Sequence, residues 1–417
     1  MTVKETTADK LHEIEQFQAD SVVCAPAHIG KLAVEKKILP LAKDWLSQSS
    51  NDLAGVFDLL RLREAGWGEQ TYAVPLGWAV LVWYYRAGLL EKFGSIPPGT
   101  WAEYQQLADF FADRKNLADA APPAEQPWSG TLEPLAPGWA GLMLMARAAP
   151  YVKHRNNFST LMDIETMEPL LGRAPWIRAL EELAAAAKTA SHNTLAMDPS
   201  AVRAAFWKGQ CAMAVTWPTA ADVPHAQPVE AGSAVPPAQS IAAGQPVAMS
   251  AQKIAVGFVE LPGSREVFDV GHNRWTPRAE DEDAHVPLLS VAGRVGVVAA
   301  GSQHPEAAYR LLLWLSDDTN SPQICPVSPW TTLFRHGHLQ AAQLWVERGA
   351  GPREAAQYAA TVSRALMRQQ WVDGLRIPGR AEYLAALDES VHRVVRGEVG
   401  ALEALVGAMG RWREITR

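Results

Sequence analysis

Tryptophan is the residue type whose chemistry stands out, with 16 copies among 417 residues. An indole ring offers a flat apolar face and one N–H donor, which suits the C–H face of a pyranose ring. Most of these rings are still expected in the core, because several fall at helical spacings. The tryptophans predicted to be core residues on this ground are Trp176, Trp314, Trp345, Trp371 and Trp412.

Motifs of catalytic and metal sites do not occur in the sequence. His12-Glu13 is followed by Gln16, so the second histidine of an HExxH zinc helix is absent. There is also no GxSxG elbow, no GxxxxGKS/T phosphate loop and no GxGxxG after a strand. We therefore expect no catalytic residue, no metal and no cofactor. A glycosidase stays an alternative, because the two carboxylates that it needs can be distant in the chain.

Length and composition indicate a globular protein with more than one core. The chain has 48% apolar and 20% charged residues, and 417 residues exceed one ordinary core. A net charge of −7, without a Lys/Arg run longer than a pair, argues against nucleic acid as a partner. Cys24, Cys211 and Cys325 are few, odd in number and far apart, so their spacing indicates neither a metal site nor a disulfide framework. They are therefore predicted to be buried thiols. No apolar run approaches the ~18–20 residues of a membrane span, and the first 16 residues lack the apolar core of a signal peptide.

Residues 69–104 give the clearest order of local elements. A strand-like run, interrupted at Pro75 and Gly77, is predicted at 72–85 and is followed by a short helix at 87–93. Gly94 is placed to end this helix, and Thr100 with Glu103 predicts a capping box for the next one. The expected order is strand, short helix, Pro-Pro break and capped helix.

The motifs in this stretch resemble the extracellular solute-binding proteins of ABC importers, specifically sugar-binding family 1, the maltose-binding-protein-like group. One departure is Arg86, which replaces the usual asparagine after Tyr84-Tyr85. Further segments resemble the family in the same order, so that the likeness covers nearly the whole chain. The segments that carry it are 72–75, 84–86, 89–94, 98–103, 200–217, 288–314 and 382–415.

The resemblance implies an α/β, two-lobe periplasmic-binding-protein-like fold (type II), with hinge strands between the lobes and a helical C-terminal segment. Lobe 1 is expected to comprise 1–83 plus 288–316, and lobe 2 to comprise 84–287 plus 317–417. The Ala/Pro/Ser/Gly-rich residues 218–252 are predicted to be a low-complexity surface insertion.

The first 24 residues offer room for one β-α-β unit, with strands at 2–6 and 20–24 and a helix at 8–17. The family opens with two such units. We therefore expect lobe 1 to be N-terminally incomplete, lacking a strand, a helix and the signal sequence through truncation or a late start. A native, reduced lobe is the alternative.

Seven residues are candidates for ligand binding. His28 follows a strand, where open α/β sheets bind ligands, and Trp217 ends the strand predicted at 211–216. Trp139 stands where family members often place an aromatic residue that faces the ligand, and Trp275 lies in a loop predicted at the cleft mouth. The full set is His28, Trp78, Tyr85, Trp139, Trp217, Trp275 and Arg294.

Arg294 occupies a position where many relatives have an aromatic residue. Its guanidinium is suited to grip a carboxylate, a sulfate or paired hydroxyls in a bidentate way. The alternative is a salt bridge between the lobes.

The resemblance implies an extracytoplasmic component of an ABC transporter that closes over a carbohydrate-like ligand by hinge motion near 82–85 and 290–295. The implied partner is the transmembrane permease of the importer, and a monomer is expected. The expected location is periplasmic or extracellular, with membrane association if an upstream segment carries a lipoprotein signal. A ligand sensor or adaptor without transport is the competing hypothesis.

Overall fold

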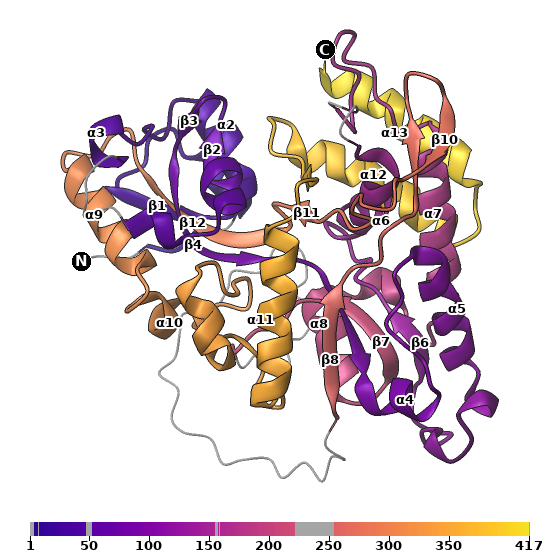
Figure 1. Cartoon of the computed structure of the whole chain (residues 1–417). Helices are drawn as coiled ribbons and strands as arrows, with labels where there is room; N and C mark the ends of the chain where they lie inside the picture. Colours follow the sequence, from indigo (N-terminus) through magenta and orange to yellow (C-terminus); the bar gives the residue numbers. More distant parts are fainter. Residues whose placement is uncertain are drawn as a thin grey trace.

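A computed structural model describes residues 4–6, 8–46, 52–154, 157, 159–221 and 254–416. Two lobes of mixed helix and sheet lie side by side, as Figure 1 shows. The insertion predicted at 218–252 falls outside the described residues, apart from 218–221. Among the helices described, none is long and apolar enough to cross a membrane.

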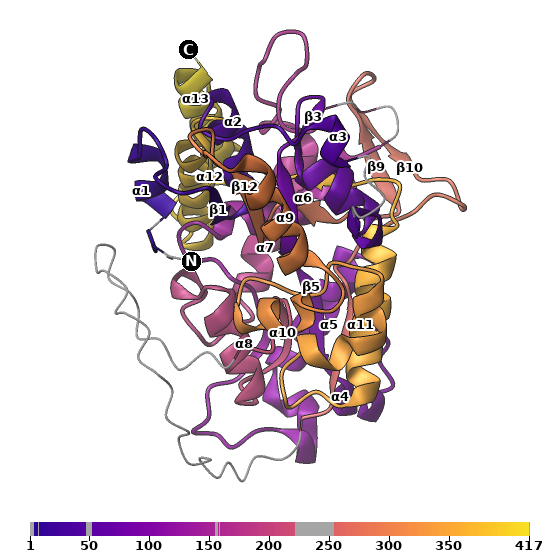
Figure 2. The same cartoon turned by 90° about the vertical axis from the view of Figure 1, so that its left-hand side faces the viewer.

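The first lobe is built on a three-stranded antiparallel sheet in the order β1-β12-β4. These strands are β1 (Ser21–Cys24), β12 (Ala292–Val298) and β4 (Ala73–Ala79). Helix α9 (Pro305–Ser316) packs on the sheet, as the turned view in Figure 2 shows. The strand predicted at 2–6 is wrong for residues 4–6, which have no regular structure.

The second lobe has a four-stranded sheet in the order β6-β7-β5-β8, with β6 and β7 parallel and the other pairs antiparallel. Its strands are β5 (Val82–Arg86), β6 (Ser129–Leu132), β7 (Cys211–Thr216) and β8 (Val256–Glu260). The helices of this lobe are α4 (Ala87–Lys92), α5 (Trp101–Ala112), α6 (Ala140–Val152), α7 (Ala174–Ala187), α8 (Pro199–Trp207), α11 (Pro352–Leu366), α12 (Arg380–Val395) and α13 (Ala401–Thr416).

The chain passes between the two sheets at two places. β4 ends at Ala79 and β5 begins at Val82, so only two residues separate a strand of one sheet from a strand of the other. The second passage runs from β11 (Leu288–Leu289) to β12 and includes Ser290 at φ 59°. β11 pairs in parallel with β13 (Val372–Asp373). The lobe boundaries at residues 83 and 288 remain a prediction.

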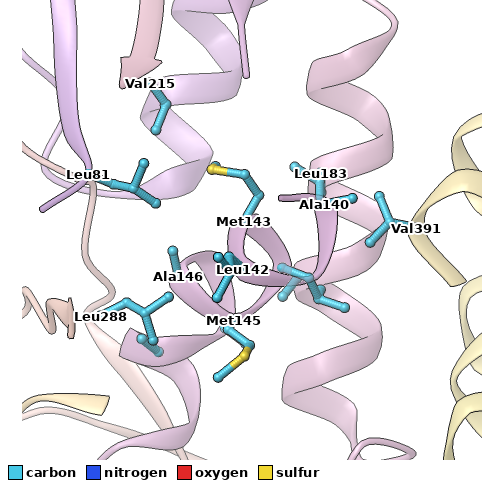
Figure 3. Close-up of a cluster of buried hydrophobic side chains, with 14 of the residues drawn as sticks. Leu81, Ala140, Leu142, Met143, Met145, Ala146, Leu183, Val215, Leu288 and Val391 are labelled. Carbon is cyan, nitrogen blue, oxygen red and sulfur yellow. The ribbon is translucent and has the colours of Figure 1, made fainter. Parts of the chain in front are cut away.

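Helix α6 forms the centre of the second lobe, because every residue of it is buried. Figure 3 shows its side chains among Val215, Leu183 and Val391 from other elements of this lobe. Leu81 and Leu288, from the two passages between the sheets, pack in the same cluster. The two chain segments that pass between the sheets are therefore packed against helix α6.

Several local predictions are confirmed. Helix α4 ends before Gly94, which adopts φ 61° as expected of a glycine cap. The Thr100 hydroxyl accepts from Glu103 N, and the Glu103 carboxylate accepts from Thr100 N, so the capping box is formed. The three cysteines are buried free thiols.

Other local predictions are wrong. The strand-like run predicted at 72–85 is interrupted after Ala79 rather than at Pro75 and Gly77, and its two parts, β4 and β5, belong to different sheets. The loop predicted around Trp275 is a hairpin of β9 (Glu266–Asp269) and β10 (Arg274–Pro277). Trp314, predicted to be core, is 53% exposed on α9, whereas Trp176, Trp345 and Trp412 are buried as expected.

The shorter elements connect these units. They are α1 (Ala8–Glu13), η1 (Pro26–His28), α2 (Ile29–Val34), α3 (Lys43–Leu46), η2 (Asp52–Gly55), η3 (Leu60–Glu64), β2 (Gly66–Trp67), β3 (Gln70–Thr71), η4 (Arg114–Ala120), η5 (Thr194–Ala196), α10 (Ser321–Ile324), η6 (Cys325–Val327) and η7 (Gly337–Trp345).

Candidate ligand-binding site

Three tryptophans from separate elements meet near the boundary between the lobes. Trp139 immediately precedes α6, Trp217 immediately follows β7, and Trp330 lies in the segment after η6. The rings of Trp139 and Trp330 are nearly parallel, at an angle of 6° with centroids 5.9 Å apart. Trp217 lies 5.6 Å from Trp139 and 6.3 Å from Trp330. Trp217 is buried, while Trp139 and Trp330 are half-buried.

Hydrogen bonds fix the start of α6 and the ring of Trp217. The Asp388 carboxylate accepts from Gly138 N at 2.6 Å and from Gly141 N at 2.7 Å, on either side of Trp139. A carboxylate in this position also interacts favourably with the positive end of the helix dipole. Trp217 Nε1 donates to the carbonyl of Pro329 at 3.0 Å, which ties β7 to the segment that carries Trp330.

Trp330 is held between the lobes by the residues that follow it. Thr332 N donates to the carbonyl of Trp78 at 2.5 Å, and the two residues form an isolated antiparallel bridge. Gly77, at φ 147°, allows this approach, because a Cβ there would lie 2.4 Å from the side chain of Thr331. The segment is therefore attached to β4 of the first lobe while Trp330 packs on tryptophans of the second.

Arg294 brings a positive charge to the cluster from β12. Its Cζ lies 5.9 Å from the Trp330 ring, within the range of a cation–π contact. Nη1 donates to the carbonyl of the preceding residue, Gly293, at 2.8 Å. Burial lowers the pKa of the Arg294 guanidinium from its ordinary value. No carboxylate of the described chain forms an ion pair with it, so the interlobe salt bridge named as an alternative is not found there.

Four of the seven candidate residues are not members of this cluster, and the first two of them are His28 and Trp78. His28 is half-buried at the end of η1, which packs against β12 beside Gly293. Trp78 is 1% exposed and contributes its backbone rather than a free ring face. The predictions for these two residues as ligand contacts remain untested.

Tyr85 and Trp275 are not brought to the cluster. Tyr85 stacks on Trp83 at 4.8 Å, and its hydroxyl accepts from Gln357 Nε2 at 3.0 Å. Trp275 packs at 5.7 Å from Tyr151, because the β9–β10 hairpin carries it onto the outer part of the second lobe. Their positions are explained by packing within that lobe.

Sequence reasoning missed Trp330. The surrounding residues 326–332, PVSPWTT, have neither helical nor strand periodicity, and two prolines mark them as a connection. The available signal was a tryptophan in a connection rather than in a periodic element, since connecting segments often carry binding residues.

Two cavities are lined by residues other than Trp139, Trp217 and Trp330. One is at the passage between the sheets and is lined in part by Val80, Val82 and His285. The other lies in the second lobe beside Trp176 and Phe268. Across the residues described, no group of three His, Cys, Asp or Glu side chains is arranged to hold a metal ion.

Besides the bridge between Thr332 and Trp78, hydrogen bonds of Glu64 and Arg376 form a second contact between the lobes. Arg376 donates to three carbonyls at the end of η3, those of Arg63, Glu64 and Gly66, at 2.8, 2.9 and 2.6 Å. The Glu64 carboxylate accepts from Ser290 N in the second passage. Burial raises the pKa of Glu64 to about 7, and the positive charge of Arg376 opposes this rise.

This raised pKa predicts that stability falls as the pH rises. Folded Glu64 holds its proton up to about pH 7, whereas the unfolded residue loses it near its ordinary pKa of 4.5. Raising the pH from 5 to 8 should therefore remove about 2–3 kcal/mol of unfolding free energy through Glu64. Glu64→Gln should lack this component. Urea titrations of both proteins at pH 5 and pH 8 check the prediction, and an identical pH dependence in the variant would contradict it.

Comparison with known proteins identifies the family of this chain. The model of the family described as "Bacterial extracellular solute-binding protein" matches residues 4–321. No curated protein matches.

Solved structures share the fold at low identity. A solute-binding protein of an ABC transporter from Agrobacterium radiobacter K84, in complex with ribitol, is 15% identical with a TM-score of 0.65, over 95% of this chain and 85% of that one. A counterpart from Agrobacterium vitis S4 with D-mannitol is 15% identical with a TM-score of 0.63, over 96% and 85%. Maltose-bound MalE3 of T. maritima is 14% identical with a TM-score of 0.63, over 97% and 86%. Because the family model spans most of the chain, the protein belongs to the bacterial extracellular solute-binding proteins.

Proposed function

We propose that this protein is the solute-binding component of an ABC importer and that it binds a carbohydrate or polyol between its lobes. The observation that carries the proposal is the group of Trp139, Trp217 and Trp330 next to Arg294 of the other lobe. The half-buried indole rings of Trp139 and Trp330, packed against the buried Trp217, suit the apolar faces of a sugar, and the guanidinium supplies directional donors. The ribitol, D-mannitol and maltose bound to structurally similar proteins favour the same ligand class.

Family membership implies a periplasmic or extracellular location. Binding there would draw the lobes together about the two passages, at residues 80–81 and 290–291. The closed protein, as a monomer, would then present surfaces of both lobes to the permease. This role requires binding and release and no catalytic residue.

Intrinsic fluorescence tests the proposal, because the tryptophans of the cluster would sense a ligand directly. The purified protein is titrated with ribitol, D-mannitol, D-tagatose and maltose, and binding is checked by calorimetry. A saturable change with at least one of these compounds is expected. A flat response to all of them and to acidic sugars, from protein with a cooperative thermal transition, would overturn the proposal.

A further inference from the structure

Arg294 has fewer acceptors than Arg203 and Arg376, two arginines with buried side chains. Arg203, behind Trp217, pairs with Glu347 at 3.4 Å and also donates to the carbonyl of Trp217. Arg376, at the second contact between the lobes, donates to three backbone carbonyls. In the described chain, the acceptor recorded for Arg294 is the carbonyl of its own neighbour, Gly293.

The surroundings of Arg294 do not balance its charge. The titratable group that acts on it electrostatically is the thiol of Cys24, whose pKa is raised to about 12 by burial. That thiol is therefore neutral at physiological pH. A half-buried guanidinium has lost part of its hydration and retains most of its five N–H donors for another partner.

The orientation of Arg294 places the remaining N–H donors of its guanidinium at the candidate binding site. Its guanidinium lies over Trp330, the ring that contacts both Trp139 and Trp217. A sugar stacked on these rings would therefore have a cation at its edge. A carboxylate matches a guanidinium best, because two parallel N–H···O bonds join the two planar groups.

We propose that the ligand is a sugar acid, with a carboxylate that Arg294 binds, and that Arg294 selects it over the neutral sugar. This inference rests on the proposed function and narrows its ligand class. Arg294 is then a specificity-determining residue rather than a structural one.

Calorimetry with matched pairs tests the inference. The probes are D-galacturonate against D-galactose, D-glucuronate against D-glucose, and D-gluconate against D-glucitol. In at least one pair the acid should bind about 10- to 100-fold more tightly, as expected for hydrogen bonds between charged groups. The preference should weaken as salt is raised from 20 to about 500 mM, because ions screen the pair.

Variants assign the preference to Arg294. Arg294→Gln should reduce the acid-to-neutral affinity ratio about tenfold or more and change neutral binding little. Arg294→Lys keeps the charge without the planar fork and should give an intermediate ratio. Arg86→Gln is the matched control, because Arg86 is also half-buried over a tryptophan, 5.7 Å from Trp128, without an ion pair in the described chain. It lies at the end of β5 opposite to the passage between the sheets and should leave the ratio unchanged.

The outcomes separate the inference from the proposed function. Equal or weaker binding of every acid, or an unchanged ratio in both Arg294 variants, would overturn the inference alone. Preference for a sulfated sugar such as galactose 6-sulfate over D-galacturonate would also overturn it. Failure to bind any sugar, acidic or neutral, would overturn both proposals. Thermal unfolding of each variant shows whether a changed ratio reflects lost folding.

Discussion

Arg147→Met is expected to lower the free energy of unfolding by about 3–5 kcal/mol, since it leaves one member of a buried ion pair without its partner. Arg147 lies within α6 with its side chain fully buried, and Nη2 pairs with the Glu133 carboxylate. Tyr104 donates to the same carboxylate at 2.8 Å, and the guanidinium stacks at 4.0 Å over Trp101. Methionine fills similar volume but leaves Glu133 with an unbalanced buried charge.

The double variant Glu133→Gln with Arg147→Met identifies the cause of this loss. Removing both charges should recover a large part of the stability, because the cost of an unpaired buried carboxylate disappears. Arg310→Met is the control. Its pair with Glu306 is exposed on α9 and should contribute less than about 1 kcal/mol. Urea denaturation measures all three, and a loss for Arg147→Met no larger than that for Arg310→Met would contradict the argument.

Trp330→Ala should have the largest effect on ligand binding of any single tryptophan substitution. Its ring contacts Trp139, Trp217 and Arg294, so its removal takes away the surface shared by the whole cluster. Removing a large apolar contact costs about 1.5–3 kcal/mol, which corresponds to an affinity loss of about 10- to 100-fold. Calorimetry with the best ligand of the fluorescence panel measures this loss.

Trp314→Ala provides the comparison for this experiment. Trp314 is 53% exposed on α9 of the first lobe and belongs to no contact of the cluster. The affinity of this variant should remain within about twofold of the unchanged protein, as is usual for exposed positions. Equal losses for Trp314→Ala and Trp330→Ala would exclude a special role of the cluster.

Predictions were most accurate where short-range interactions decide the structure. The capping box at Thr100 and the glycine cap at Gly94 depend on residues within a few positions. The strand predicted at 211–216 was likewise found as β7. The two-lobe fold followed from the order of such motifs through the family resemblance.

The site was only partly predictable, because its residues meet through contacts distant in the sequence. Trp139, Trp217 and Arg294 were among the candidates and do lie together, whereas Trp330 was missed because its segment has no periodicity. Tyr85 has the same residue chemistry as a ligand contact, but strand pairing places it beside Trp83 and Gln357. Residue type alone does not distinguish these positions.

The sequence by itself determined local features such as the capping box at Thr100, because these hydrogen bonds act within a few residues. The two-lobe family was implied by the resemblance of its motifs to known solute-binding proteins. Only the tertiary structure decided which tryptophans are neighbours, that Trp314 is exposed, and that no described carboxylate pairs with Arg294. The physical reason is that burial and pairing depend on elements far apart in the chain, whose approach is set by sheet register and by the packing around α6.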